Sequence, residues 1–171
     1  MKHISFFLLL SVVCCLTFLL TGCSDKIKLG GTTDGITYRF AAKSDLPQIC
    51  ECAADAEKNF VKYYREEKHY TENTNVPVII ALDKTEVAGA LIVSIENEGK
   101  GIGSVGCTAT KHSHRGKGIA TNMICLGTKH LKDLGLSKAF LGYTYTGILN
   151  MYSRAGYQVC TEYYMGEKAV T

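Results

Sequence analysis

The sequence predicts a single domain of the mixed α/β class, with helices packed on a sheet. Runs rich in β-branched and aromatic residues occur at 36–40, 76–82 and 87–95, and the last two flank a short turn that suits a hairpin. Apolar residues recur at helical spacing over 46–60 and 119–134. The 171 residues contain no second composition block after the N-terminal segment, which fits one domain.

The remaining elements follow from local signals. Residues 101–106 match Gly-x-Gly-x-x-Gly literally, but no helical pattern opens from them, so we expect a strand over 101–110 and no dinucleotide fingerprint. A strand at 136–143 and a short helix at 148–155 follow, with Gly156 at the helix end. Ser44 is expected to cap the first helix, because Pro47 then falls in its first turn.

The N-terminus carries a long apolar run. Met1-Lys2-His3 precedes an uncharged run over residues 4–22, which predicts a secretory signal at 1–22 or, alternatively, a membrane anchor of marginal length. Leu20-Thr21-Gly22-Cys23 resembles a bacterial lipobox, and this resemblance implies lipidation of Cys23. Residues 23–35 are then expected to form a polar tether. We therefore expect a membrane-anchored protein, although the charges flanking the run barely decide which side it faces.

The stretch from His114 to Ala120 predicts an anion-binding turn between a strand and a helix. Unpaired N–H groups and the helix dipole favour an anion at a helix N-terminus. Gly116 and Gly118 let an anion approach the backbone, and Arg115 and Lys117 add positive charge. The alternative is a helix entry whose glycines only relieve crowding.

Arg115-x-x-Gly118-x-Ala120 resembles the coenzyme-binding signature of the GCN5-related N-acetyltransferases, the GNAT superfamily. Tyr152-x-x-x-Gly156-Tyr157 resembles a second family motif, at the expected order and separation. The resemblance spans residues 36 to about 164 and implies a GNAT-like domain at 36–171, with a central, mostly antiparallel twisted sheet flanked by helices. It also implies acetyl-CoA as co-substrate and a small-molecule or peptide amine as acceptor.

The resemblance assigns roles residue by residue. The coenzyme turn comprises Arg115, Gly116, Lys117, Gly118, Ile119 and Ala120, while the backbone of Thr108 and Thr110 pairs with the pantetheine arm. Tyr152 protonates the departing thiolate, a role that suits a phenol because its ordinary pKa is near 10. The alternative for Tyr152 is a packed aromatic with a hydrogen-bonded hydroxyl.

The general base departs from the family pattern. The strand before the coenzyme turn lacks the glutamate that many members place there, so we expect Glu96 as the base, with His112 as the second candidate. Tyr145 occupies the position of a frequent family asparagine, and Thr144 or Thr146 could supply its hydrogen bond. The acceptor pocket is expected over residues 60–75, where aromatics and carboxylates suit a cationic amine or form a solvated face.

Cysteines and charge restrict the other function classes. Cys107, Cys125 and Cys160 stand among apolar residues, which favours reduced core thiols over a disulfide. Cys50-x-Cys52 and His112-x-His114 lack partner ligands, so no metal site is predicted. A net charge of +3 without a basic stripe gives no support for nucleic-acid binding.

Two functions are compatible with this sequence. The first is a membrane-tethered N-acetyltransferase that uses acetyl-CoA, and the resemblance favours it. The alternative is a non-catalytic surface lipoprotein that uses the same fold as a ligand-binding module, which the lipobox and the missing strand glutamate support.

Overall fold

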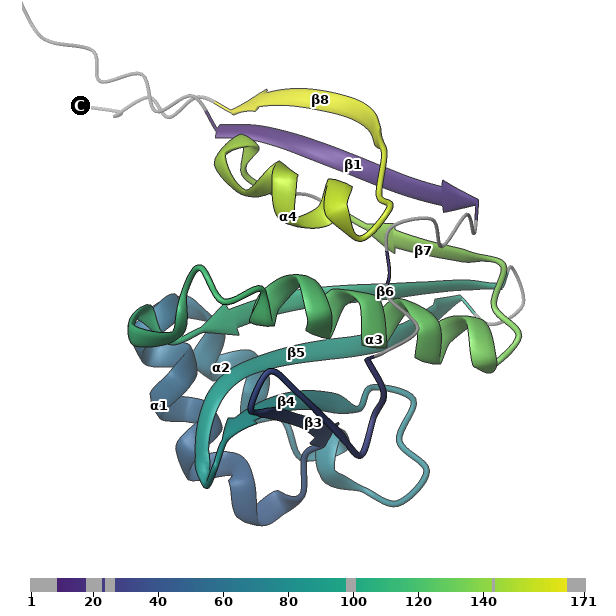
Figure 1. The fold of residues 1–171 in the computed structure, drawn as a ribbon. Helices are drawn as coiled ribbons and strands as arrows, with labels where there is room; N and C mark the ends of the chain where they lie inside the picture. The colour runs from purple at the N-terminus through teal and green to yellow at the C-terminus, as the bar shows by residue number, and fades with distance from the viewer. Residues whose placement is uncertain (1–8, 18–22, 24–26, 98–100, 143, 166–171) are drawn as a thin grey trace, which may run out of the picture.

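The computed structural model describes residues 9–17, 23, 27–97, 101–142 and 144–165 (Figure 1). Within them, eight strands form one sheet in the order β2-β3-β4-β5-β6-β7-β1-β8. The strands are β1 (Leu9–Thr17), β2 (Gly31–Thr33), β3 (Ile36–Phe40), β4 (Val78–Asp83), β5 (Glu86–Asn97), β6 (Ile102–Thr110), β7 (Lys138–Leu141) and β8 (Val159–Met165). Neighbours are antiparallel except β6 and β7, so the mixed, mostly antiparallel sheet is confirmed.

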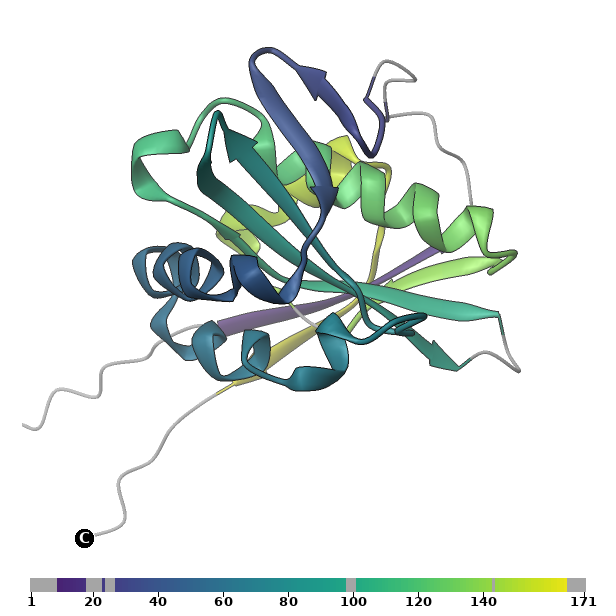
Figure 2. The ribbon, with the colours of Figure 1, turned by 90° about the horizontal axis from the view of Figure 1, so that it is seen from below.

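Helices cover both faces of the sheet. The α-helices are α1 (Leu46–Ala56), α2 (Val61–Tyr64), α3 (Ile119–Asp133) and α4 (Leu149–Arg154). Figure 2 shows α1 and α2 on one face and α3 on the other. Residues of β4 alternate between the two cores: Ile79 packs in the α3 cluster, whereas Val78 and Ile80 pack in the α1 cluster.

Two glycines let α3 approach the sheet closely. A Cβ on Gly127 of α3 would lie 2.9 Å from Val105 and 3.0 Å from Leu91, and one on Gly89 of β5 would lie 2.8 Å from Met123. At these distances a Cβ would force its neighbours to shift, so the glycines at both points allow the close approach of α3 to the sheet. This packing fixes where the N-terminus of α3 meets β6.

The start of α1 differs from the prediction. The helix begins at Leu46 with Asp45 as its N-cap, after a 3-10 turn at Lys43–Asp45. Asp45 accepts a hydrogen bond from the Ala42 backbone N–H at 2.7 Å and two from the Arg39 guanidinium at 2.7 and 2.8 Å. The carboxylate that pairs with Arg39 therefore organises this end, and Ser44 does not cap it.

The strands β6 and β7 diverge along their length. Their parallel pairing covers only Ile102–Ser104 opposite Lys138–Phe140, although β6 continues to Thr110. Figure 1 shows β7, α4 and β8 leaning away from β6 and α3. The divergence separates β6 from β7 near Thr108 and Thr110, the residues that the sequence analysis assigns to the pantetheine arm of the coenzyme.

The N-terminal run has a different place from the one predicted. Residues Leu9–Thr17 form β1, which pairs with β7 on one side and β8 on the other. The nine residues of β1 are only part of the run, and an apolar segment of that shorter length also suits a strand inside a sheet, because periodicity alone does not separate a buried strand from a helical segment. Residues 1–8 and 18–22 of the predicted signal lie outside the described residues. No helix in the described part of the chain has the length and apolar character needed to span a bilayer.

Residues 23–35 also differ from a free tether. Cys23 forms a disulfide with Cys125 of α3, Ile27 is buried, and Gly31–Thr33 pair with β3. The prediction of a reduced Cys125 is therefore wrong, because the chain leaving β1 passes beside α3. Cys160 is exposed, not in the core, while Cys52 is buried and reduced.

Candidate active site

The strand β6 contains a bulge three residues before its end. Ala90 pairs with Ala109 and Ile92 with Gly106, so the single residue Leu91 faces both Cys107 and Thr108. Cys107 has φ 48°, in the left-handed region that non-glycine residues rarely adopt. A bulge of this kind leaves one residue outside the ladder and re-aims its backbone groups. One residue of the pair Cys107 and Thr108 is thus left out of the regular ladder with β5.

The predicted anion-binding turn has the expected geometry. Gly116 and Gly118 have φ 79° and 75°, and Gly118 is the N-cap of α3. A Cβ at either glycine would meet nothing within 4 Å, so open space faces this backbone. The arrangement suits a phosphate, since unpaired N–H groups of α3 face that space.

Arg115 lies folded against the protein beside this turn. Its Nε donates to the Thr110 carbonyl at 3.4 Å and its Nη2 to the Ala56 carbonyl at 3.5 Å. Both hydrogen bonds are long, and the side chain is exposed. The guanidinium can therefore exchange them for a phosphate at little cost.

Three acidic side chains contact the residues that precede the glycine turn and so fix its position. Asp55 accepts from the backbone N–H of His112 at 2.6 Å and lies 3.0 Å from its Nδ1, and these bonds hold the pKa of Asp55 below its usual value. Asp83 lies 3.2 Å from Nε2 of the buried His114, and Glu86 accepts from Lys111 at 2.7 Å. His112 thus serves as a structural partner of Asp55.

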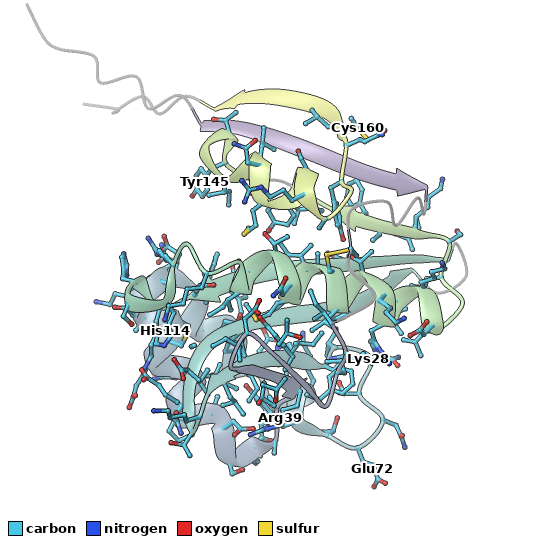
Figure 3. The ribbon with its side chains drawn as sticks, viewed as in Figure 1. Lys28, Arg39, Glu72, His114, Tyr145 and Cys160 are labelled. Atoms are coloured by element: carbon cyan, nitrogen blue, oxygen red, sulfur yellow. A yellow bond between two sulfur atoms is a disulfide. The ribbon has the colours of Figure 1, made fainter. Side chains whose placement is uncertain are left out.

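A cavity of about 820 Å³ connects the bulge, the turn and the divergent strands. Seven of the predicted coenzyme and catalytic positions line it beside Tyr152: Thr108, Thr110, Arg115, Gly116, Gly118, Ile119 and Ala120. Lys117 is exposed and is not among the lining residues. Figure 3 places His114 and Tyr145, which both line the cavity, on opposite sides of the space between β6 and α4.

Tyr152 lies where β6 and α4 face each other. It is buried, its hydroxyl lies 3.4 Å from Oγ1 of Thr108, and its ring contacts that of Tyr157 edge-on. The structure thus brings together two residues that the sequence assigns to different parts of the coenzyme, Tyr152 on α4 and Thr108 on the bulged strand. The hydroxyl is therefore within reach of a group bound along the bulge.

Glu96 lies at the other end of β5. Its neighbour Asn97 pairs with Ile102, at the start of β6, so about five residues of strand separate this position from Thr108. At about 3.3 Å per residue, the backbone distance is roughly 17 Å. The side chain of Glu96 lies outside the described residues, and its role as base stays a prediction.

Sequence reasoning missed two residues of the site. Among the described residues, the carboxylate that lines the cavity is that of Glu57, at the end of α1, beside Phe60 and Tyr63. Tyr64 was expected in the acceptor pocket, but it is fully buried and donates its hydroxyl hydrogen to the Cys107 carbonyl. No local pattern marks either role, because both depend on α1 and α2 packing against β6. Thr144 lines the cavity, whereas Thr146 does not.

The fold and the cavity define an α/β domain with an open glycine turn at the N-terminus of α3, a geometry that suits a phosphate group. Residues 45–158 match the model of the Acetyltransferase (GNAT) family, and the chain belongs to this family of acetyl-CoA-dependent acyltransferases. No curated protein matches the chain.

Solved structures carry the same fold. A GCN5-related glucosamine N-acetyltransferase region of a fungal multi-domain GH3 β-N-acetylglucosaminidase has TM-score 0.68 and 17% identity, over 95% of this chain and 21% of that one. The GCN5-related N-acetyltransferases of Sphaerobacter thermophilus (TM-score 0.66, 20% identity, 92% and 50% covered) and Kribbella flavida (0.63, 15%, 90% and 55%) are also similar. The chain thus spans about half or less of these three proteins.

Proposed function

We propose that this protein transfers the acetyl group of acetyl-CoA to the nitrogen of an amine. The observation that carries the proposal is the open, positive-φ glycine turn at the start of α3, which faces the same cavity as Tyr152 and the β6 bulge. The lining of that cavity combines a phosphate site and backbone donors, and it also includes Glu57, Phe60 and Tyr63, which are available to an acceptor.

The chemistry follows from these positions. The amine nitrogen attacks the thioester carbonyl, a C–N bond forms, and the C–S bond then breaks. Backbone N–H groups at the bulge stabilise the negative charge that develops on the carbonyl oxygen. The departing thiolate takes a proton from Tyr152, and the nitrogen loses its proton to a base.

A titration with acetyl-CoA tests the coenzyme site. We expect binding to raise Tm, since at 100 times Kd a ligand adds about 2.7 kcal/mol of stability. Gly118→Glu should abolish the rise, because its carboxylate occupies the phosphate position. Gly35→Glu is a matched control, with φ 79° and open space in the β2–β3 turn. Equal binding by the Gly118 variant would refute the proposal, and binding without transfer to any amine would favour the ligand-binding module.

Membrane tethering is a separate proposal. The lipobox-like sequence before Cys23 supports it, and lipidation excludes the Cys23–Cys125 disulfide because both need the same sulfur. We expect lipid labelling of the wild-type chain and none of Cys23→Ser. Unlabelled wild-type protein that stays in the aqueous phase would remove this proposal.

A further inference from the structure

The bulge in β6 is braced by a tyrosine outside the cavity. Tyr64, at the end of α2, is fully buried among the side chains under α1, and its hydroxyl donates to the carbonyl oxygen of Cys107. The residue that receives this bond is the one with φ 48°. The other non-glycine residues with positive φ in the described chain, Asp34, Asn73 and Lys84, lie in turns or loops.

Fixing this carbonyl also fixes an N–H group. The peptide between Cys107 and Thr108 is planar and trans, so its C=O and its N–H point in opposite directions. Because the Cys107 carbonyl points toward Tyr64, the Thr108 N–H points away from Tyr64. Thr108 itself lines the cavity and places its hydroxyl 3.4 Å from that of Tyr152.

A second tyrosine holds the first. The hydroxyl of Tyr70, in the 3-10 turn Glu67–Tyr70, donates to the backbone carbonyl of Tyr64 at 2.8 Å. Nε2 of the buried His69 lies 3.0 Å from the carbonyl oxygen of Tyr63. Burial raises the pKa of the Tyr64 hydroxyl well above its usual value, so it keeps the proton that it donates.

We propose that Tyr64 is a positioning residue that aims the Thr108 N–H at the thioester carbonyl, with Tyr70 as its support. This inference rests on the proposed function, because it needs acetyl-CoA in the cavity. The hydroxyl of Tyr64 acts through the bulge and touches neither substrate. Its effect is on the polarisation of the carbonyl and, through it, on turnover.

The test is the carbonyl stretch of bound [1-13C]acetyl-CoA, measured by isotope-edited infrared spectroscopy on the full chain. A hydrogen bond from Thr108 N–H lowers this frequency relative to free acetyl-CoA. We expect the shift in the wild type and its loss in Tyr64→Phe, which keeps the buried ring. The Kd for acetyl-CoA should be unchanged, whereas kcat with any accepted amine should fall by about 100-fold, as when a group is misplaced by about 1 Å.

Tyr38→Phe is the matched control. Tyr38 is equally buried, and its hydroxyl accepts from Nδ2 of Asn122 at 3.0 Å, away from the bulge. We expect the control to keep the full infrared shift. A retained shift in Tyr64→Phe would overturn the inference, and so would an equal loss in Tyr38→Phe.

Two further outcomes separate the proposals. Wild-type protein that binds acetyl-CoA without a shift overturns the role of Tyr64 and leaves the coenzyme site standing. Wild-type protein that does not bind acetyl-CoA overturns the proposed function and this inference together. If Tyr64→Phe does not fold, Tyr70→Phe is the substitute test, because it removes only the hydrogen bond from Tyr70 to the Tyr64 carbonyl. We expect this variant to lose part of the infrared shift. A full shift in Tyr70→Phe would then contradict the inference.

Discussion

At the scale of single residues, Tyr152 offers the sharpest test of the chemistry. We expect Tyr152→Phe to lower kcat about 10²–10⁴-fold, the usual contribution of a general acid, while the Kd for acetyl-CoA stays close to that of the wild type. The ring remains to pack against Tyr157. Steady-state kinetics and calorimetry measure the two quantities. Unchanged turnover would make Tyr152 a packing residue.

Two carboxylates are the candidates for the base that takes the proton of the amine. Glu57 lines the cavity, whereas Glu96 belongs to the far end of β5. If Glu57 receives the proton of the amine, Glu57→Gln removes the acidic limb of the pH profile of kcat/KM and Glu96→Gln leaves it intact. The reverse result would restore Glu96 as the base.

The residues of the coenzyme turn could be predicted from the sequence, whereas the roles of Glu57 and Tyr64 could not. Gly116 and Gly118 are read from the sequence because a glycine pair before a helix has a local backbone reason. Tyr64 owes its role to a hydrogen bond with Cys107, 43 residues later in the chain, and Glu57 owes its role to the packing that forms the cavity. Nothing in their immediate sequence distinguishes a tyrosine that lines the cavity, such as Tyr63, from one that braces the strand.

At the scale of elements, the start of α1 carries a pH dependence. The Arg39 guanidinium and the Ala42 N–H hold the pKa of Asp45 below its usual range. The folded pKa lies below the unfolded value of about 3.9, so this stabilisation is present above about pH 4 and is lost as the pH falls through the folded pKa. Asp45→Asn should cost about 1 kcal/mol at neutral pH, because Arg39 is partly exposed to solvent.

Urea unfolding at pH 3 to 7 measures this effect. The wild type should lose stability toward pH 3 more steeply than Asp45→Asn does. Glu66→Gln is a control, because its partner Lys68 is two residues away at the surface. If the stability of the wild type and of Asp45→Asn changes in parallel with pH, the Arg39–Asp45 pair does not contribute to the pH dependence.

The disulfide makes α3 sensitive to reductant. Cys23 and Cys125 are 102 residues apart, so their bond closes a long loop in the unfolded chain. In protein whose Cys23 carries no lipid, we expect reduction to lower the free energy of unfolding by about 2–4 kcal/mol. Cys23→Ser should unfold identically with and without reductant. If reductant leaves the free energy of unfolding of the wild type unchanged, the disulfide does not form.

The hairpin and the first helix illustrate what local sequence can establish. The turn at 83–86 and the strands beside it are predicted because their signals are adjacent, and the structure reproduces them as β4 and β5. The cap of α1 was predicted at Ser44 because serine is a good cap in isolation. Asp45 takes that position because it pairs with Arg39, which lies on the preceding strand.

At the scale of the whole molecule, deleting residues 1–22 separates two roles of the N-terminal run. In the structure, the deletion removes β1 and exposes the facing edges of β7 and β8. Each kcal/mol lost lowers Tm by about 2–4 °C in a domain of this size, so we expect a fall of roughly 10 °C or more. Calorimetry of both chains measures it. Equal Tm values would mean that the domain does not need β1 and that the run is free to act as a signal.

The overall class of the fold was predictable, whereas the insertion of β1 between β7 and β8 was not. Strand and helix patterns over residues 36–164 are local, and a family resemblance orders them. An uncharged run suits a signal, an anchor or an internal strand equally well in composition. The contacts that select among them, with β7 and β8, join the two ends of the chain.

The position of β1 has a consequence for the order of events during synthesis. Leu9 pairs with Met165, and Cys14 pairs with both Leu141 and Val159, so the first strand to leave the ribosome must wait for the last. Contacts this distant in sequence form slowly, because a long loop has to close before they stabilise anything. Throughout translation the apolar run is unpaired and accessible to any factor that recognises such segments. The run can therefore reach its partners in β7 and β8 only after the ribosome has synthesised residue 165.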